Sequence, residues 1–451
     1  MAETNKPIRV ITYGTYDMLH YGHIRLLERA KALGNYLIVG ITSDDYDKSR
    51  GKINLQQSLM ERIEAVRATG IADEIIVEEY DGQKIDDVQR YDIDIFAIGS
   101  DWAGKFDYLN KLCKVEYLDR TEGVSSSAIR ASKRSIRLGL VGDGKNAIVS
   151  KYVNESRLVN GLDISGMMSA HCLGGPVPDS VPRFESYSEL LDNSDAVYII
   201  SKPTEHYLQI KQALECGKHV LVESPVATNK EEVDELFKLA HERGLVLMDA
   251  IKTAYATAYN RLLLIAKEGK IGNIISVDAT CTSLRDIGNA DIPMAWNSIC
   301  GWGPTAMLPV FQILGTQYTR AQITTLFKDS ENFFDSFTHI HFQYPKAVAT
   351  IKVGMGVKSE GELIISGTKG YIYVPAPWWK TDYFETRFED QSENKRYFYQ
   401  LDGEGIRYEL VAFVKEIEAP KSYSYISSEV SSSIGNVIGH FYSGDDMVII
   451  G

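Results

Sequence analysis

The sequence has few cysteines and no pattern among them. The five cysteines are spread over 451 residues, and no two stand in a C-x-x-C arrangement. This argues against a disulfide framework or a zinc site and favours a reducing compartment. No apolar run reaches the ~18–20 residues that a membrane span needs, and the polar start, Met1 to Pro7, lacks the pattern of a signal peptide. These absences predict a cytoplasmic protein with no membrane partner.

A dense run of basic residues is also missing. The formal net charge is −13, with 48 Lys and Arg against 61 Asp and Glu, which argues against a nucleic-acid-binding protein. Any site for a phosphate must therefore be built locally from a few residues. Internal repeats and low-complexity tracts are absent, and a length of 451 residues predicts two or three domains.

Strand and helix patterns alternate over the first 130 residues. The apolar periodicity predicts strands at 8–13, 36–42, 74–77, 93–98 and 115–118, with helices at 22–33, 58–67 and 85–90. This order predicts a parallel sheet with helices on both faces. Ligands of such sheets bind at the carboxyl ends of the strands.

The alternation starts afresh after a polar segment. Strands are predicted at 136–141, 161–168, 196–200, 219–222 and 245–248, and from about residue 256 longer strands at 274–282, 337–343, 347–352, 362–366 and 370–374 follow a helix. We predict an α/β protein with a Rossmann-like domain at 1–130, a linker at 131–135, a dinucleotide-binding Rossmann domain at 136–255 and an α+β open-sheet domain at 256–451. The last domain should be mostly antiparallel.

A glycine turn and two histidines follow the first strand. The sequence Y-G-T-Y-D-M-L-H-Y-G-H at 13–23 places His20 and His23 three residues apart where a helix begins, so both lie on one face of its first turn. The unpaired N–H groups and the dipole at a helix start favour an anion. Gly22 between the histidines lets a phosphate approach the backbone. The turn therefore predicts a site for nucleotide phosphates.

Other polar residues follow other strands of the same predicted sheet. Arg50, Lys52 and Arg62 follow the second strand, G-S-D-W-A-G-K-F-D occupies 99–107, and R-T-E-G-V-S-S-S at 120–127 runs into a helix predicted to start near Ser126. The serines are explained equally well as helix caps. All of these segments nevertheless meet at one edge of the sheet.

Together these blocks resemble the glycerol-3-phosphate cytidylyltransferases over about residues 8–130. The resemblance implies a nucleotidyltransferase domain that transfers CMP from CTP to a polyol phosphate, with Mg²⁺ bound through the CTP phosphates rather than by protein ligands. It implies catalytic roles for His20, His23, Lys52 and Arg120, although the spacing at Lys52 is one residue longer than in the family. The nucleotide-binding residues that it implies are Tyr13, Gly14, Thr15, Asp17, Gly22, Arg62, Asp101, Trp102, Thr121, Ser125, Ser126 and Ser127.

The second half carries a dinucleotide fingerprint, Gly142-x-Gly144-x-x-Ala147, after a strand. With the blocks S-K-P-T-E-H at 201–206, E-S-P at 223–225 and S-G-T-K-G at 366–370, it resembles the Gfo/Idh/MocA oxidoreductases over about 136–451. The resemblance implies NADPH or NADH as cofactor. The cofactor-binding residues that it implies are Gly142, Gly144, Ala147, Ser169, Pro203, His206, Glu223 and Ser224.

Three departures from that family leave two interpretations. The family's E-K-P motif reads Glu223-Ser224-Pro225, the segment 307–311 has neither the acid nor the histidine of the family, and the strand ending at Met168 has no acidic residue after it for the ribose of NAD. Ser169 and His171 would suit the 2′-phosphate of NADP. Either Lys252 serves as a relocated acid/base, assisted by Tyr255 or His206, or the half is an inactive oligomerisation or regulatory module.

The leading hypothesis is a bifunctional enzyme. Its first part would make a CDP-polyol from glycerol 3-phosphate or a longer alditol phosphate such as glucitol 6-phosphate. Its second part would reduce a sugar or triose phosphate carbonyl to that polyol phosphate, for capsule or teichoic-acid-like polymers. The alternatives are a monofunctional cytidylyltransferase and a sensor that binds CTP and NADPH without turnover. We also expect a homo-oligomer, a dimer through the C-terminal sheet.

Overall fold

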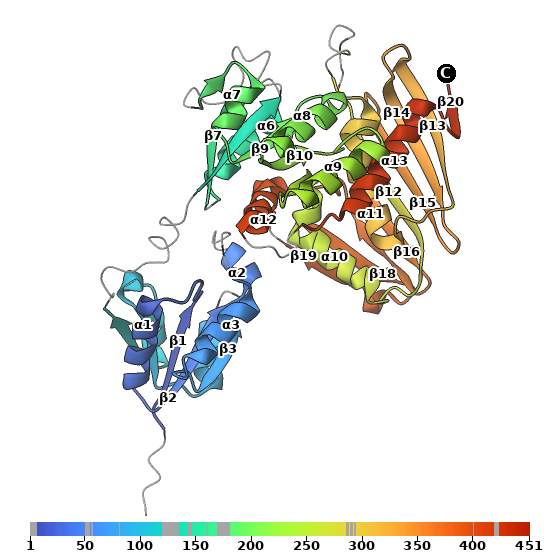
Figure 1. The fold of residues 1–451 in the computed structure, drawn as a ribbon. Coiled ribbons are helices and arrows are strands. Elements are labelled where there is room, and N and C mark those ends of the chain that lie inside the picture. Colours follow the sequence, from blue (N-terminus) through green and yellow to red (C-terminus); the bar gives the residue numbers. More distant parts are fainter. Residues whose placement is uncertain are drawn as a thin grey trace, which may run out of the picture. The chain divides into compact units, whose positions relative to one another are not determined.

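The computed structural model describes residues 7–49, 55, 57–80, 82–119, 135–142, 147–159, 161–168, 181–285, 288, 292, 295–399, 401–418 and 424–451. The chain divides into two compact units, Met1–Arg134 and Ser135–Gly451 (Figure 1). Each unit has its own sheets and is described by itself.

The first unit is a five-stranded parallel sheet in the order β3-β2-β1-β4-β5. Its strands are β1 (Arg9–Gly14), β2 (Tyr36–Thr42), β3 (Glu74–Glu78), β4 (Ile95–Gly99) and β5 (Lys114–Leu118). Its helices are α1 (Tyr21–Ala32), α2 (Asp44–Ser49), α3 (Leu59–Ala68), α4 (Gln83–Arg90) and the short η1 (Ser100–Trp102) and η2 (Asp107–Lys111). The predicted parallel α/β sheet is confirmed, and the helix predicted near Ser126 lies outside the described residues.

Alternate side chains of the central strands enter two separate cores. Val10 of β1 packs in one core with Leu27 of α1, whereas Ile11 packs in the other with Phe96 of β4 and Val88 of α4. Because neighbouring residues of a strand point to opposite faces, both faces of the sheet are buried. The sheet therefore exposes its strand ends, and these are the places left for a ligand.

Gly40 of β2 leaves room for a buried tyrosine. A Cβ atom at this position would lie 2.3 Å from Cδ1 of Tyr13, whose side chain is 4% exposed. We expect Gly40→Ala to lower the free energy of unfolding of the first unit by about 1–3 kcal/mol, the usual cost of overpacking a core. The change is measured by denaturant unfolding.

Gly99 at the end of β4 supplies the matched control. A Cβ atom there meets nothing within 4 Å, so Gly99→Ala should change the stability by no more than ~0.5 kcal/mol. Equal losses in the two variants would show that contact with Tyr13 does not explain the glycine at position 40.

The second unit begins with a six-stranded parallel sheet in the order β11-β10-β9-β6-β7-β8. The strands are β6 (Ile136–Gly142), β7 (Leu162–Met168), β8 (Arg183–Phe184), β9 (Ala196–Ile200), β10 (His219–Glu223) and β11 (Leu247–Ala250). They alternate with α6 (Ala147–Ser156), α7 (Tyr187–Asp192), α8 (Pro203–Glu215) and α9 (Lys230–Glu242). This is the predicted Rossmann arrangement, with β8 as a strand that the sequence pattern did not predict.

A nine-stranded mixed sheet follows, in the order β19-β18-β17-β16-β12-β15-β14-β13-β20. Its strands are β12 (Ile274–Ser283), β13 (Arg320–Asp329), β14 (Phe334–Gln343), β15 (Val348–Met355), β16 (Leu363–Gly367), β17 (Gly370–Val374), β18 (Tyr383–Phe388), β19 (Lys395–Phe398) and β20 (Met447–Ile449). All neighbours are antiparallel except β12 with β15 and β13 with β20. The prediction of a mostly antiparallel open sheet is confirmed, although β13, β18, β19 and β20 were not foreseen.

Helices join the two sheets of the second unit into one body. Its remaining helices are η3 (Lys252–Tyr255), α10 (Thr257–Lys267), α11 (Ser298–Leu314), η5 (Gln391–Glu393), η6 (Asp402–Gly405), α12 (Ile406–Glu418) and α13 (Ser428–Ser443). Helix α11 lies on β12, β14 and β15, α13 contacts both α11 and α9, and α12 contacts α6 (Figure 1). The larger core of this unit runs from Val149 of α6 through Phe413 of α12 and Ile434 of α13 to Ile351 of β15, and a second core lies among β9, β10, α8 and α9. The predicted division at residue 255 stays a prediction.

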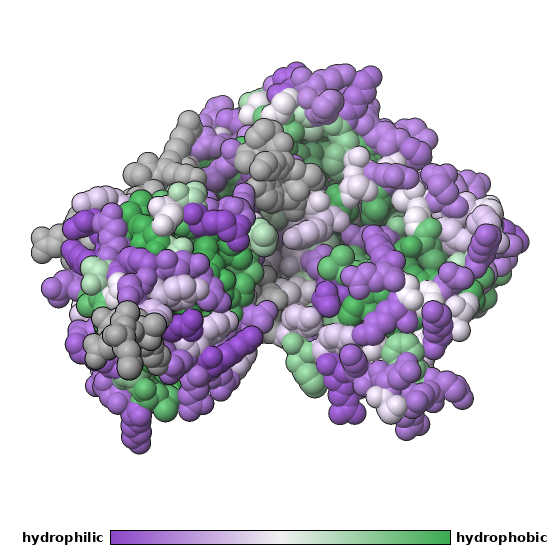
Figure 2. Space-filling model, turned by 90° about the horizontal axis from the view of Figure 1, so that it is seen from below, coloured by the Kyte–Doolittle hydropathy of each residue, from purple (hydrophilic) through white to green (hydrophobic). Residues whose placement is uncertain are grey.

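The surface is hydrophilic over most of the face in Figure 2, with apolar side chains in separate patches. Large apolar side chains that are strongly exposed are scattered along the chain, such as Leu208 of α8, Leu284 directly after β12 and Phe398 of β19, and exposure of this kind is ordinary. Within the part of the chain that the structure describes, no helix has both the length and the apolar character to cross a membrane.

Candidate functional site

The two histidines of the first unit lie at the start of α1, directly after β1. His20 is the residue before the helix, and its side chain does not cap it. The rings of His20 and His23 stack with centroids 3.8 Å apart, and Tyr16 packs edge-on against His23 at 5.6 Å. The first turn of α1 carries no acidic residue, so its positive end and both imidazoles can face one phosphoryl group.

The loop between β1 and α1 is held by side chains in a conformation that the backbone does not favour. Tyr16 and Met18 both have left-handed backbone angles, with φ of 53° and 51°, which side-chain-bearing residues rarely adopt. Met18 N donates to Oε1 of Gln57 (2.7 Å), and Gln57 N donates to Oδ1 of the buried Asp17 (3.0 Å). Asp17 therefore fixes the loop that presents the histidines.

Arg62 of α3 connects the carboxyl ends of the two central strands. Its side chain is fully buried, and Nη1 donates to the carbonyl oxygens of Thr15 (2.6 Å) and Thr42 (2.9 Å). Its guanidinium also pairs with Asp44 and lies 3.8 Å from Oδ2 of Asp47. Thr15 Oγ1 donates to Oδ1 of the same Asp47 at 3.0 Å. Arg62 and Thr15 thus hold the carboxyl ends of β1 and β2 in place through buried contacts.

The other described residues of the predicted CTP site occupy mixed positions. Tyr13 is in the core, where its hydroxyl donates to Oδ2 of Asp87 at 2.8 Å, so only its backbone is left for a ligand. A Cβ atom at Gly14 would lie 2.9 Å from Cζ of Tyr16, which explains the glycine, and Gly22 is the second residue of α1.

Asp101 and Trp102 form part of η1, directly after β4. Asp101 is exposed, whereas the Trp102 ring packs against Phe106 at 5.9 Å and lies under the ammonium group of Lys105. The predicted site residues Arg50, Lys52, Arg120, Thr121, Ser125, Ser126 and Ser127 lie outside the described residues.

In the second unit, the first strand ends at the first glycine of the predicted dinucleotide fingerprint. β6 ends at Gly142, whose φ is 153°, and a Cβ atom there would lie 2.9 Å from the carbonyl carbon of Ile200. α6 begins at Ala147, and residues 143–146 between strand and helix lie outside the described residues. Pro203 is the first residue of α8, a position that suits proline. Gly144, Ser169 and His171 are outside the described residues.

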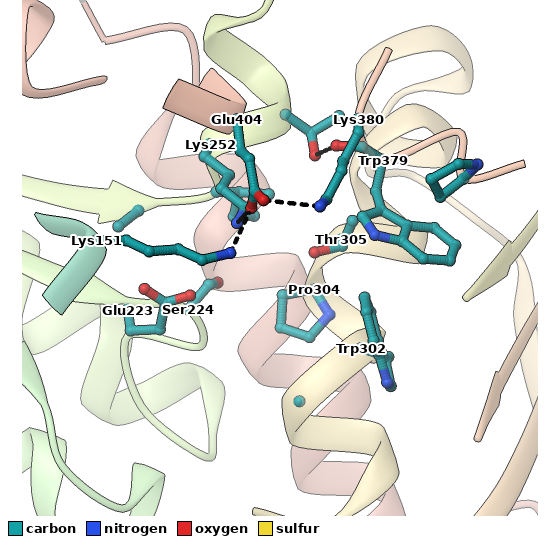
Figure 3. Close-up of a pocket in the computed structure, with 15 residues that line it drawn as sticks. Lys151, Glu223, Ser224, Lys252, Trp302, Pro304, Thr305, Trp379, Lys380 and Glu404 are labelled. Carbon is teal, nitrogen blue, oxygen red and sulfur yellow. Dashed lines mark hydrogen bonds and ion pairs between the residues drawn. The ribbon is translucent and has the colours of Figure 1, made fainter. Parts of the chain in front are cut away.

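A pocket of about 430 Å³ lies between the ends of β10 and β11 and the start of α11 (Figure 3). Glu223 and Ser224 line it from β10 and the turn after it, and Lys252 lines it from η3. Three residues that the sequence proposed for the oxidoreductase site are therefore brought together.

Two further lysines and a glutamate enter the same pocket (Figure 3). Glu404 of η6 lies 2.8 Å from Nζ of Lys151 through Oε2 and 2.8 Å from Nζ of Lys380 through Oε1, and Nζ of Lys252 is 3.3 Å from Oε2. Burial opposes ionisation of Glu404, but the hydrogen bonds from Lys151 and Lys380 and the charge of Lys252 outweigh it and lower its pKa to about 2. We call Lys151, Lys252, Lys380 and Glu404 the lysine cluster. Sequence reasoning identified only Lys252, because the others stand in no motif.

Buried carboxyl groups lie beside and beneath the pocket. Tyr198 donates to Glu223 and Tyr152 to Glu409, and the two tyrosine rings stack with centroids 4.0 Å apart. Burial raises the pKa of Glu223 and, more strongly, that of Glu409. The protonated form of these acids is therefore favoured relative to a carboxyl group in water.

Asp249, on β11, has a titration that can be tested. It is 1% exposed, and its Oδ2 accepts from Ser431 Oγ at 2.7 Å. Burial raises its pKa to about 6. Because this pKa is higher in the folded protein than in the unfolded chain, protonation of Asp249 favours the folded state. That stabilisation is fully present below the ordinary pKa of an aspartate and is lost as the pH rises through about 6. We therefore expect Asp249→Asn to stabilise the second unit by ~1–3 kcal/mol at pH 8 and by about nothing near pH 4, in denaturant unfolding.

Asp234 gives a control of opposite sign. Burial is outweighed by hydrogen bonds from Lys230 and Ser432, and the pKa of Asp234 is lowered. Asp234→Asn should therefore lose stability at neutral pH relative to acid. A parallel pH trend in the two variants would contradict the account of Asp249.

Two other acid/base candidates of the sequence lie elsewhere. Both ring nitrogens of the buried His206 face carbonyl oxygens, those of Pro225 and Ser201, at 2.8 Å each, and burial lowers the pKa of His206 to about 4. Tyr255 is 3% exposed, with its hydroxyl 3.4 Å from Oγ of Ser424. Neither lines the pocket, whereas Lys252 does. The segment 307–311 is buried in α11.

Comparison with known proteins connects the first unit to cytidyl transfer. The cytidylyltransferase-like family pattern matches residues 11–132. Glycerol-3-phosphate cytidylyltransferase of Bacillus spizizenii is 46% identical over 128 residues, 28% of this chain and 98% of that protein. The enzyme of the same name from Staphylococcus aureus is 47% identical over 126 residues, 27% of this chain and 92% of that protein.

The second unit resembles oxidoreductases in pattern and fold. The pattern of the Gfo/Idh/MocA oxidoreductase family, described as an NAD-binding Rossmann fold, matches residues 138–250. A crystal structure of a 3-ketoreductase from Actinomadura kijaniata in complex with NADP and TDP-benzene superposes with a TM-score of 0.59 at 19% identity, covering 70% of this chain and all of that one. The chain thus belongs to the glycerol-3-phosphate cytidylyltransferase family through its first unit, to which an NAD(P)-binding oxidoreductase domain of the Gfo/Idh/MocA family is fused.

Proposed function

We propose that this protein is a bifunctional enzyme that makes a CDP-polyol. Its first unit transfers CMP from CTP to glycerol 3-phosphate or to a longer alditol phosphate such as glucitol 6-phosphate. The observation that carries this proposal is the stacked pair His20 and His23 at the start of α1. The likeness to enzymes named glycerol-3-phosphate cytidylyltransferase supports it.

The transfer is an in-line displacement. An oxygen of the polyol phosphate bonds to the α-phosphorus of CTP, the bond from that phosphorus to the bridging oxygen breaks, and pyrophosphate leaves. A phosphate monoester is already ionised at neutral pH, so the step needs no general base. His20 and His23 stabilise the charge that builds on the phosphate oxygens, and Lys52 and Arg120 are proposed to neutralise it further.

Mg²⁺ is proposed to enter bound to the CTP phosphates and to supply additional charge neutralisation. Over the described ranges, no three or more His, Cys, Asp or Glu side chains are grouped to hold a metal ion. The donor set around His20 and His23 suits phosphate oxygens better than a cation.

The second unit is proposed to reduce the carbonyl group of a sugar or triose phosphate. The Rossmann domain would hold NADPH or NADH near Gly142, and the cofactor would supply hydride. Lys252 lines the pocket and gives a proton to the carbonyl oxygen as it becomes an alcohol. The product would be the polyol phosphate that the first unit consumes, and the CDP-polyol would serve capsule or teichoic-acid-like polymers.

A second candidate is a cytidylyltransferase with an inactive oxidoreductase module. It is favoured by Ser224 in place of the lysine of the family motif and by the wholly apolar segment 307–311. In either case we propose a homodimer through the nine-stranded sheet. Buried and partly exposed side chains alternate along β13 and β15, so one face of that sheet is left accessible.

Two assays separate these candidates. Pyrophosphate release from CTP is measured with glycerol 3-phosphate and glucitol 6-phosphate, and failure with every polyol phosphate would overturn the transferase. NADPH oxidation is measured with fructose 6-phosphate and dihydroxyacetone phosphate. No oxidation, together with no NADPH binding by calorimetry, would leave only the inactive module.

A further inference from the structure

The lysine cluster carries more positive charge than its own carboxylate balances. Lys151 comes from α6, Lys252 from η3 and Lys380 from the loop between β17 and β18, yet their ammonium groups all lie within 3.3 Å of Glu404. Within the cluster, three ammonium groups and one carboxylate leave an excess of two positive charges. Glu223, the other carboxyl group that lines the pocket, has its pKa raised by burial, which opposes its ionisation. A phosphate monoester carries about −1.5 to −2 at neutral pH, which matches that excess.

The turn that carries Glu404 is shaped to bring its carboxylate to the lysines. Gly403, Glu404 and Gly405 have φ of 56°, 55° and 93°, and the left-handed region is unfavourable for a glutamate. A Cβ atom at Gly405 would lie 2.7 Å from the carbonyl oxygen of Lys252, so the turn passes directly over the backbone of η3. Glu404 thus has an unfavourable backbone conformation in the position where its carboxylate is the counter-ion of the three lysines.

The rest of the pocket suits a polyhydroxylated molecule. The rings of Trp302 and Trp379 line it with centroids 4.9 Å apart. Aromatic faces beside a cationic end fit a sugar-like chain that ends in a phosphate.

The position of the cluster distinguishes the phosphate of a substrate from that of the cofactor. The ribose of a dinucleotide binds at the end of the second Rossmann strand, which is β7 here. The pocket is at the ends of β10 and β11, and β9 and β6 lie between β10 and β7 in the sheet order. The cluster is therefore on the side of the sheet away from the cofactor's 2′-phosphate.

We propose that Lys151 and Lys380 of the lysine cluster bind the phosphate group of the oxidoreductase substrate, a phosphorylated polyhydroxy carbonyl compound or its alcohol. Lys252 remains for the carbonyl group, and Glu404 holds the three lysines together until the phosphate displaces it. This inference rests on the proposed reduction for the identity of the substrate. The binding itself can be tested without turnover.

The test is site-resolved labelling of lysines with an amine-reactive reagent, read by mass spectrometry on the full chain. Glucitol 6-phosphate at ten times its dissociation constant should slow labelling of Lys151 and Lys380 about tenfold, whereas glucitol should not. Lys380→Gln should raise the half-protecting concentration for Lys151 about ten- to a hundredfold, because a hydrogen bond between charged groups is lost. Glu404→Gln should lower it, because the competing charge is gone.

Lys211→Gln is the matched control, because Lys211 pairs with Glu235 at 2.7 Å outside the pocket. Lys211→Gln should leave the half-protecting concentration of glucitol 6-phosphate for Lys151 unchanged. Protection by NADP⁺ but not by glucitol 6-phosphate would overturn the inference in favour of a cofactor phosphate, and weaker binding in Glu404→Gln would overturn the displacement.

NADPH oxidation separates this inference from the proposed function. Protection without oxidation of NADPH by any carbonyl compound would remove the proposed reduction and leave the phosphate site. Equal kcat/KM for fructose 6-phosphate and fructose, without protection, would remove the phosphate site and leave the reduction.

Discussion

His23→Ala is expected to lower the rate of pyrophosphate release from CTP by about 10²–10³-fold, the usual loss when one donor to a developing charge is removed. The His23 ring stacks on His20 at the start of α1, where a phosphoryl group would gain charge in the transition state. The loss should fall on kcat more than on KM, since the donor acts most strongly on the transition state. Steady-state kinetics with saturating glycerol 3-phosphate measure both constants.

His23→Ala removes both a hydrogen-bond donor and the ring contact with Tyr16, so the two losses must be separated. His23→Asn keeps a donor of smaller size and should recover part of the rate. His241→Ala, at an exposed position on α9 of the second unit, should keep full activity. A rate within threefold of the unmodified protein in His23→Ala would assign the histidine to packing alone.

Arg62→Met is expected to destabilise the first unit by about 3–5 kcal/mol, the cost of removing one partner from a buried ion pair. Methionine fills a similar length, but it leaves two carbonyl oxygens and the carboxylates of Asp44 and Asp47 without the guanidinium. Because Arg62 and Asp47 are both fully buried, water cannot replace the guanidinium beside Asp47. Denaturant unfolding of the full chain, followed through the transition of the first unit, measures the loss.

Arg67→Met on the same helix is the matched control. Arg67 pairs with Glu64, and both side chains are more than half exposed, so the variant should change stability by no more than ~0.5 kcal/mol. A loss no larger in Arg62→Met than in Arg67→Met would show that Arg62 does not hold the strand ends together.

Most of the parallel sheets could be predicted from the sequence, because buried strands appear as short apolar runs between glycine turns. The strands β18 and β19 could not, since they are short and mix charged with aromatic residues. β13 did carry a signal that was missed, since Ala321, Ile323 and Thr325 are buried at every second position. The same alternation places Tyr13 with Ile11 in the core beneath α4, which explains why its side chain does not reach the predicted nucleotide site.

Of the two candidate sites, one could be predicted from the sequence and the other could not. His20 and His23 are close in sequence, so a helical spacing predicts that their rings meet. The lysine cluster draws on positions 151, 252, 380 and 404, and only the folded chain brings them together. A lone lysine in a helix or loop gives no signal of its own, because most such lysines are solvated.

The contact of α13 with α9 and α11 has a consequence for the order in which the chain matures during synthesis. The strands of the first unit pair only with one another, between positions 9 and 118, so this unit can fold soon after it leaves the ribosome. The core of the second unit stays incomplete until position 443 has been translated. At roughly 5–20 residues per second the interval lasts on the order of tens of seconds. A nascent chain therefore carries a folded first unit while apolar helix faces of the second unit are still without their last partner, and chaperones have that interval in which to act.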